Sequence, residues 1–203
     1  MRLALHTVGV TPQSEVIMPA VSFVATANAA SHLGAVPHFV DIDADNLGLC
    51  PTSLNQRLKD IAIKQGSKVI NRETGREISA VVAVHIFGEP AKVKEIADVA
   101  KEWDLPLVED AAEALGSWVG EREAHCGLIG DIGIFSFNGN KLITTGGGGM
   151  IITNDEQLAY KAKHLSTTAK VSHPWLFNHD EIGWNDRMPN INAAIGLAQM
   201  EKI

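Results

Sequence analysis

The sequence predicts an α/β fold in which helices cover both faces of a mostly parallel sheet. Short apolar runs bounded by turn residues, such as AVVAVH at residues 80–85, are typical of buried strands. Segments with helix start and stop signals alternate with these runs, and repeated strand-helix units build such sheets. The chain has 203 residues and 45% hydrophobic content, which is enough for one well-packed domain and argues against disorder.

The first part of the chain predicts a helix end, a strand, a helix and a second strand. Residues 1–10 are interpreted as the end of a helix, and residues 15–19 form a short strand that ends at a proline. Ser22 is a suitable N-cap for a helix that continues to about residue 33. Residues 36–42 follow as the next strand.

The middle of the chain predicts two helices around a central strand. A helix begins at a proline and covers residues 51–65, and the polar residues 64–79 form a small excursion or hairpin. Residues 80–85 are the strongest buried strand, and a helix covers residues 91–103. His85, at the end of that strand, could line an active site, but a hydrogen-bonded structural histidine is the favoured interpretation.

Three more strands are predicted at residues 105–109, 132–137 and 149–153. Asp155 follows as the N-cap of a helix that continues to about residue 165. These elements complete the alternating pattern.

The charge and the motifs exclude several function classes. A formal net charge of −7 gives no basic field, so nucleic acid and anionic membranes are poor partners. No run reaches the roughly 18 to 20 apolar residues of a membrane span. Two cysteines without metal spacing suit a reducing compartment, so the expected location is the cytoplasm.

Motifs for the common metal and nucleotide sites are missing as well. The acidic residues at positions 41, 43 and 45 lack the glycine and the glutamate of a calcium loop, so no metal site is expected there. The four glycines at 146–149 precede a strand, the wrong context for a dinucleotide fingerprint, and neither a P-loop nor a GxSxG motif occurs.

The most informative stretch is GDIGIFSFNGNKLITTGGGG, residues 130–149. A buried strand leads to a single lysine, Lys141, and four glycines follow it. Buried strand ends hold reactive groups accurately, and glycines let the backbone approach a flat ligand. Taken alone, the stretch also fits a surface lysine in a glycine-rich hairpin.

A second stretch, LPLVEDAAEALGS at residues 105–117, favours the reactive interpretation of Lys141. Its strand delivers Glu109 and Asp110 into a small-residue turn that is expected to open a helix. Ligands bind at the carboxyl ends of such strands, where a carboxylate can keep a heterocyclic nitrogen protonated. A lysine that forms a Schiff base, together with an aspartate on a pyridinium nitrogen, is the pairing that pyridoxal phosphate chemistry requires.

The sequence resembles the DegT/DnrJ/EryC1/StrS family of pyridoxal-phosphate-dependent nucleotide-sugar aminotransferases, in particular the branch that makes 4-amino-4,6-dideoxy sugars. Five blocks in order carry the resemblance and span most of the chain: residues 19–43, 84–90, 108–117, 130–155 and 181–196. The resemblance implies the large domain of a fold-type-I transferase over residues 1–203. It also implies that a phosphate-binding loop would precede this segment and a small C-terminal domain would follow it, so we expect a fragment of a longer enzyme.

The family assigns roles to five positions of this sequence. Lys141 would hold pyridoxal 5′-phosphate covalently and later act as the base, and Asp110 would bind the pyridinium nitrogen. Ser136 would bind the phosphate through its hydroxyl group. Phe23 would stack on the cofactor, although an ordinary core position is an equally good interpretation. Asn185 would reach the phosphate of a neighbouring subunit, which implies a homodimer with shared active sites.

Some positions depart from the commonest pattern in the family. Glu113 stands where many relatives have glutamine or histidine beside the phenolic oxygen of the cofactor, and a carboxylate there must be protonated or turned away. Glutamate does occur in the 4-amino-sugar branch. Asn138, Trp184 and Asp186 replace residues that are frequent in relatives, so no sugar contact is assigned to these positions.

The resemblance implies conversion of a nucleotide-linked 4-keto-6-deoxy sugar to the 4-amino sugar, with glutamate as the donor, for cell-surface polysaccharide or related amino-sugar synthesis. Two alternatives stay open. One is a sugar dehydratase that uses the same cofactor, although the 3-dehydratase branch has histidine in place of the lysine. The other is a non-catalytic binding or assembly module of the same fold.

Overall fold

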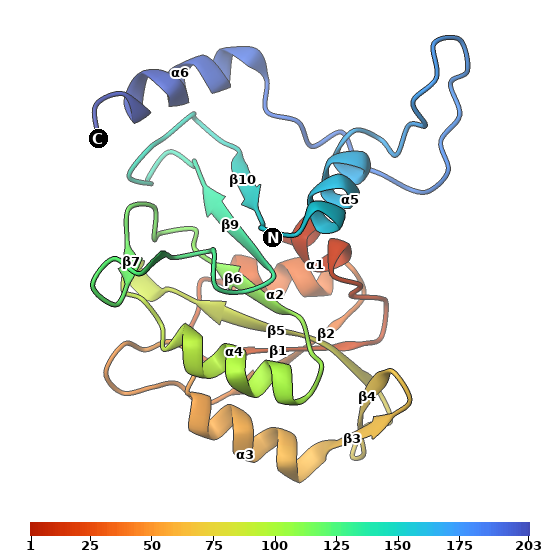
Figure 1. The fold of residues 1–203 in the computed structure, drawn as a ribbon, viewed down its shortest axis with the longest axis vertical. Coiled ribbons are helices and arrows are strands. Elements are labelled where there is room, and N and C mark those ends of the chain that lie inside the picture. Colours follow the sequence, from red (N-terminus) through yellow and green to blue (C-terminus); the bar gives the residue numbers. More distant parts are fainter.

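The computed structural model describes residues 1–203 and confirms the α/β fold (Figure 1). The main sheet has the strand order β10-β9-β6-β5-β1-β2. All neighbours on this path are parallel except β10, which pairs antiparallel with β9. The strands of this path are β1 (Glu15–Pro19), β2 (Val36–Val40), β5 (Glu77–Val84), β6 (Leu107–Asp110), β9 (Ile132–Ser136) and β10 (Gly149–Ile152).

Two hairpins complete the β structure. The polar segment predicted as an excursion or hairpin, residues 64–79, contains the second half of β3 (Ala62–Gln65) and all of β4 (Lys68–Asn71). Strand β4 also pairs with the start of β5. A separate small hairpin joins β7 (Trp118–Val119) to β8 (Ala124–His125). The hairpin interpretation of the polar segment is therefore confirmed.

Helices cover both faces of the sheet, as predicted. One face carries α3 (Pro51–Ile61) and α4 (Val93–Glu102), and the other carries α1 (Arg2–Thr7) and α2 (Val24–Ser31), with α5 (Glu156–Ser166) packed on α1 (Figure 1). A short 3₁₀ turn, η1 (Ile86–Gly88), follows β5, and α6 (Asn190–Met200) comes last. None of these helices is both long and apolar enough to cross a membrane.

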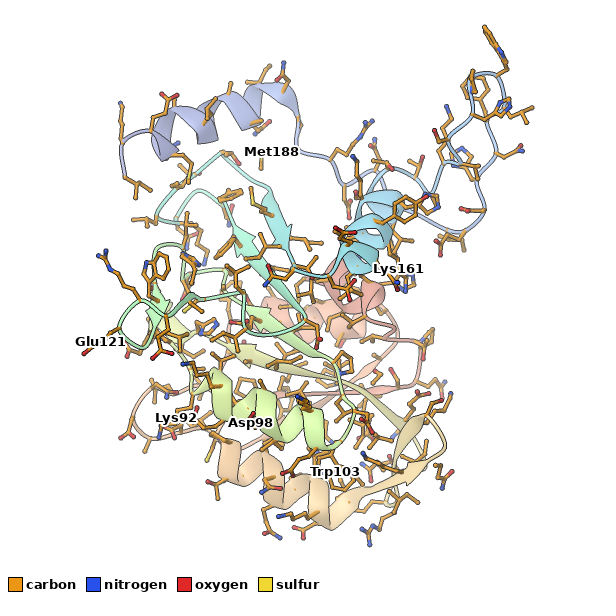
Figure 2. All side chains as sticks on the ribbon, viewed as in Figure 1. Lys92, Asp98, Trp103, Glu121, Lys161 and Met188 are labelled. Carbon is orange, nitrogen blue, oxygen red and sulfur yellow. The ribbon has the colours of Figure 1, made fainter.

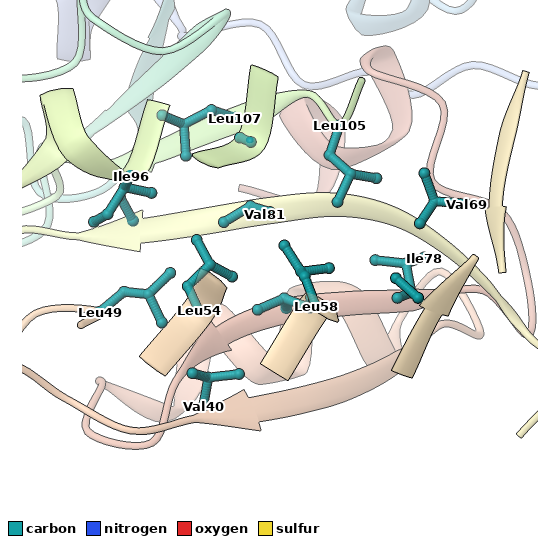
Figure 3. Close-up of a cluster of buried hydrophobic side chains, with 14 of the residues drawn as sticks. Val40, Leu49, Leu54, Leu58, Val69, Ile78, Val81, Ile96, Leu105 and Leu107 are labelled. Atoms are coloured by element: carbon teal, nitrogen blue, oxygen red, sulfur yellow. The ribbon is translucent and has the colours of Figure 1, made fainter. Parts of the chain in front are cut away.

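The strand alternation divides the core into two layers. Along β5, Val81 and Ala83 face α3 and α4, whereas Val82 and Val84 face α1 and α2. This alternation follows from the two-residue period of a strand. Figure 3 shows the first layer, in which apolar residues of α3 spaced four apart, Leu54 and Leu58, lie beside the sheet. The same alternation sends the neighbouring carboxylates of Glu109 and Asp110 to opposite faces of the sheet.

Two predicted helix boundaries were wrong, and one predicted helix does not form. Ser22 does not cap α2; Phe23 occupies the N-cap position, and the Ser22 hydroxyl donates to the Thr26 hydroxyl instead. The helix at residue 51 ends at Ile61 because residues 62–65 pair as a strand with β4. No helix follows Asp110, since its side chain accepts the Ala112 N–H and holds a turn there.

The last part of the chain is much less buried. Residues 167–185 form an arm that reaches away from the sheet and is closed by the bridges Thr167↔Asn185 and Lys170↔His179 (Figure 1). Helix α6 has no buried residue. Between them, Met188 packs against the buried cluster that contains Phe135 and Phe137 (Figure 2).

Candidate functional site

The carboxyl ends of the parallel strands β5, β6 and β9 open onto a cavity of about 520 Å³. Ligands in open α/β sheets bind at this edge. The structure brings together five of the six predicted site residues in the lining: Phe23, Asp110, Glu113, Ser136 and Lys141. These residues come from the start of α2, from the ends of β6 and β9 and from the loops after those two strands. They lie up to 118 positions apart in the sequence, so the cavity is a product of the sheet order.

Asp110 is the last residue of β6 and is 8% exposed. The Thr26 hydroxyl donates to its Oδ2 at 2.6 Å, and the Ala112 N–H donates to its Oδ1 at 3.2 Å. Each carboxylate oxygen can accept more than one hydrogen bond. Asp110 is thus a fixed carboxylate that retains acceptor capacity toward the cavity.

Lys141 and Glu113 form an ion pair at the cavity. The Lys141 Nζ donates to Glu113 Oε1 at 2.9 Å, and the lysine side chain is 16% exposed. The other oxygen, Glu113 Oε2, accepts the Phe87 N–H at 3.1 Å. The Glu113 carboxylate is therefore turned toward the lysine amine. Lys141 is not a free surface lysine.

The turn that Glu113 holds has an unusual backbone. Phe87 has φ 54° and ψ 20°, a left-handed conformation that is uncommon for a large residue. Its ring is exposed. Next to it, Gly88 has φ 83°, and a Cβ there would lie 2.8 Å from the Glu113 carbonyl oxygen. The turn and residue 113 are thus packed tightly against each other.

Phe23 and Ser136 complete the cavity lining. Phe23 is 77% exposed at the start of α2, so the interpretation as an ordinary core residue was wrong. Ser136 ends β9, and its Oγ accepts the Asn138 N–H at 3.4 Å, which leaves the hydroxyl proton available. An exposed aromatic ring at the start of α2 and a hydroxyl donor at the end of β9 therefore line the same cavity.

Asn185 is the one predicted site residue outside the cavity. It is exposed on the arm and pairs with Thr167 through a backbone bridge. Its predicted role belongs to the site of a neighbouring subunit, so it stays a prediction.

Glu109, next to Asp110, points to the opposite side of the sheet and is fully buried. Its carboxylate accepts hydrogen bonds from His85 Nε2 and from three backbone N–H groups, at 2.5 to 2.9 Å: Gly127, Ile129 and Gly130. Burial alone would raise the pKa of Glu109, but the hydrogen bonds from His85 and the amides lower it below its ordinary value of 4.5.

His85 has the structural role that the sequence favoured. The Ala91 N–H donates to its Nδ1 at 3.1 Å, so Nδ1 is an acceptor and the proton lies on Nε2, toward Glu109. The ring has no exposed surface, although the residue borders the cavity. His85 therefore orients Glu109 and is not available to a ligand.

Two clusters of acidic residues lie outside the cavity. Asp43 and Asp45 both contact Lys92, at 2.7 and 3.2 Å, and the hydrogen bond from Lys92 lowers the pKa of Asp43. The sequence analysis missed a second group at the base of the arm: His164, Asp180 and Glu181 place one ligand atom each within 4.8 Å of one another. The shortest contact there is a hydrogen bond of 2.7 Å between His164 Nε2 and Asp180 Oδ1.

Sequence reasoning also missed Thr26 and Phe87. Thr26 lies inside the family block at residues 19–43, but no local pattern marks it as a site residue, and its partner Asp110 is 84 residues away. For Phe87, the neighbouring glycine in IFGEP was the only local signal of an unusual turn. Both residues are identified by contacts across the fold.

Comparison with known proteins adds a family and several relatives. The model of the DegT/DnrJ/EryC1/StrS aminotransferase family matches residues 1–203. The GDP-perosamine synthase of Escherichia coli O157:H7 is 37% identical over 202 residues, which cover 100% of this chain and 50% of that protein. The dTDP-4-dehydro-2,3,6-trideoxy-D-glucose 4-aminotransferase of Saccharopolyspora spinosa is 34% identical over 212 residues, covering 99% of this chain and 50% of that protein.

A solved structure with a similar fold is NtdA from Bacillus subtilis with bound cofactor PMP. It has a TM-score of 0.80 and 29% sequence identity, over 98% of this chain and 41% of that one. The chain thus spans about half the length of the curated relatives that it matches.

Proposed function

This chain belongs to the DegT/DnrJ/EryC1/StrS aminotransferase family, and we propose that it forms the cofactor-binding part of a pyridoxal-phosphate-dependent aminotransferase that acts on nucleotide-linked sugars. The observation that carries the proposal is the single cavity that holds the Lys141 amine and the Asp110 carboxylate. Both groups lie at the carboxyl edge of the sheet, Asp110 at the end of β6 and Lys141 in the loop after β9, as a covalently held pyridine ring would need.

The residues present fit the cofactor. Asp110 offers a carboxylate to the ring nitrogen, Ser136 a hydroxyl to the phosphate, and Phe23 an exposed ring for stacking. Lys141 offers the amine for covalent attachment. When bound, pyridoxal phosphate supplies an electron-withdrawing ring that stabilises negative charge on the adjacent carbon. The side chains would bind and orient the cofactor and move protons.

The ion pair suggests how Lys141 becomes reactive. A lysine attacks a carbonyl carbon only as a neutral amine, so it must first lose a proton. Glu113 Oε1, at 2.9 Å from Nζ, is in position to accept that proton. The Phe87 N–H on the other oxygen keeps the carboxylate aimed at the lysine. Glu113 therefore holds and moves a proton at Nζ.

The substrate and the assembly extend this proposal. The GDP-perosamine synthase among the relatives supports a nucleotide-linked sugar, and the dTDP-4-dehydro-2,3,6-trideoxy-D-glucose 4-aminotransferase supports a keto sugar aminated at carbon 4 as the acceptor. Glutamate as donor follows from the family resemblance. A homodimer is proposed because Asn185 lies outside its own cavity. The arm and α6 also expose large apolar side chains, which are typical of an interaction surface: Trp175, Phe177, Ile182, Ile191 and Leu197.

Spectroscopy and peptide mapping test the proposed function. The protein is saturated with pyridoxal phosphate, and the cofactor band is followed while glutamate is added, and then GDP- or dTDP-linked 4-keto-6-deoxy sugars. We expect glutamate to shift the band and one of the sugars to restore it. Borohydride reduction should leave the cofactor on Lys141. A band that glutamate does not shift would instead indicate a non-catalytic module, and product without amino transfer would indicate a dehydratase.

A further inference from the structure

The carboxylate of Asp110 is held by a chain of two hydroxyl groups from the start of α2. Thr26 lies in the first turn of that helix and is 1% exposed. Its Oγ1 contacts Asp110 Oδ2 at 2.6 Å, and Ser22 Oγ contacts Thr26 Oγ1 at 2.9 Å. These two hydrogen bonds join Ser22, Thr26 and Asp110, which the sequence analysis did not connect.

The direction of each hydrogen bond follows from its acceptor. An ionised carboxylate can only accept, so the Thr26 hydroxyl must donate to Asp110. That leaves the Thr26 oxygen as the acceptor for the Ser22 hydroxyl. Ser22 also has an alternative acceptor, the Phe23 carbonyl oxygen at 3.1 Å. Ser22 therefore supports the chain more weakly than Thr26 does.

The hydrogen bond that the Thr26 hydroxyl donates is unusual for a threonine in a helix. A threonine in a helix usually bonds to the carbonyl oxygen three or four residues earlier, as Ser31 does on this helix with Ala27 at 3.1 Å. The Thr26 hydroxyl instead crosses to β6. Together with the Ala112 N–H on Oδ1, it fixes the rotation of the Asp110 carboxylate.

We propose that Thr26, supported by Ser22, is the positioning residue for Asp110, and that it presents this carboxylate to the protonated nitrogen of a heteroaromatic ligand. The inference rests on the proposed function and deepens it, because it names the group that aims the carboxylate.

A double-mutant cycle tests whether Thr26 acts through Asp110. The variants are Thr26→Val, which removes the hydroxyl at similar size, Asp110→Asn, and the double variant, each assayed for the dissociation constant of pyridoxal phosphate and for the pH dependence of its absorption band. We expect Thr26→Val to weaken binding about tenfold, the effect of losing one charge-assisted hydrogen bond. In the Asp110→Asn background the same change should have an effect below about twofold.

Conservative variants separate positioning from packing. Thr26→Ser keeps the hydroxyl and should restore binding to within about threefold of wild type, whereas Ser22→Ala should weaken it about threefold. Ser31→Ala, on the same helix but without a link to Asp110, should change nothing. Circular dichroism and thermal unfolding verify that each variant is folded.

The two levels of the proposal fail in different ways. If Thr26→Val weakens binding by the same factor in both backgrounds, Thr26 acts by packing and the positioning role is wrong, although the proposed function stands. If Asp110→Asn alone changes neither the affinity nor the band, Asp110 does not contact the ring nitrogen. In that case the assignment of Asp110 in the proposed function is wrong, and the inference falls with it.

Discussion

Two neighbouring carboxylates at the end of β6 are placed in very different surroundings. Glu109 is fully buried on the α3 and α4 side and accepts four hydrogen bonds, one of them from His85. Asp110 lies on the α1 and α2 side, accepts two hydrogen bonds and borders the cavity. The strand period of two sends the residues to opposite faces. A fully satisfied carboxylate stabilises the fold, and a partly satisfied one is available to a ligand.

A substitution of Lys141 in the cavity should have the largest effect on cofactor attachment. Lys141→Ala removes the only lysine that lines the cavity, so covalent attachment of pyridoxal phosphate should be lost completely. Mass spectrometry of peptides after borohydride reduction measures it. The matched control is Lys161→Ala, since the Lys161 amine donates to the Thr7 carbonyl oxygen outside the cavity and should not matter. An adduct on Lys161 or Lys163 in wild-type protein would overturn the assignment.

The buried side should show the largest effect on stability. Glu109→Ala leaves His85 and three N–H groups without their acceptor, and we expect a loss of about 3 to 5 kcal/mol of unfolding free energy. Urea denaturation measures this loss. Asp110→Asn serves as the comparison and should cost less than about 1 kcal/mol. Equal losses in the two variants would contradict the division between a structural and a ligand-binding carboxylate.

The same pair predicts a dependence on pH. The pKa of Glu109 is lowered in the folded protein from its ordinary value of 4.5. Its ionisation therefore contributes stability at pH values above about 4.5, and that contribution is lost as the pH falls through the lower folded pKa. The stability difference between wild type and Glu109→Ala should shrink below pH 4.5. A difference that is constant from pH 7 to pH 3 would show that the charge of Glu109 is irrelevant.

Asp110→Asn should lower the rate of the reaction more than it lowers the stability of the fold. An amide cannot keep the ring nitrogen protonated, so the single-turnover rate with glutamate should fall more than tenfold, about 1.4 kcal/mol in the barrier. Stopped-flow absorbance measures that rate. A smaller loss would place Asp110 with Glu109 as a merely structural carboxylate and remove the contrast between them.

Glu113→Gln should have the smallest effect of the series. The amide keeps the contact with the Phe87 N–H but cannot take a proton from Lys141, so covalent attachment should slow by about three- to tenfold at pH 7. The rate is followed from the growth of the cofactor band. Glu123→Gln, which changes an exposed glutamate that pairs with Lys94, is the control and should leave the rate unchanged. An unchanged rate in Glu113→Gln would remove Glu113 as the proton acceptor.

The amino-acid sequence by itself predicted the six strands of the main sheet path and the presence of Lys141 and Asp110 at one edge of that sheet. Both follow from local patterns: apolar runs predict buried strands, and the carboxyl ends of parallel strands meet at one edge. The sequence did not predict that residues 62–65 leave the helix for a strand, because that depends on pairing with β4.

Only the tertiary structure decided which polar groups became partners. The contacts of Thr26 with Asp110, of Lys141 with Glu113, and of Glu109 with the loop after β8 join residues that are 18 to 84 positions apart. Sheet order and register set these distances, and neither is encoded in a window of neighbouring residues. Ser22 is a further example. The local sequence predicts that its hydroxyl caps a helix, but in the structure this hydroxyl donates to Thr26. A local pattern names a hydrogen-bonding group, but the fold selects its partner.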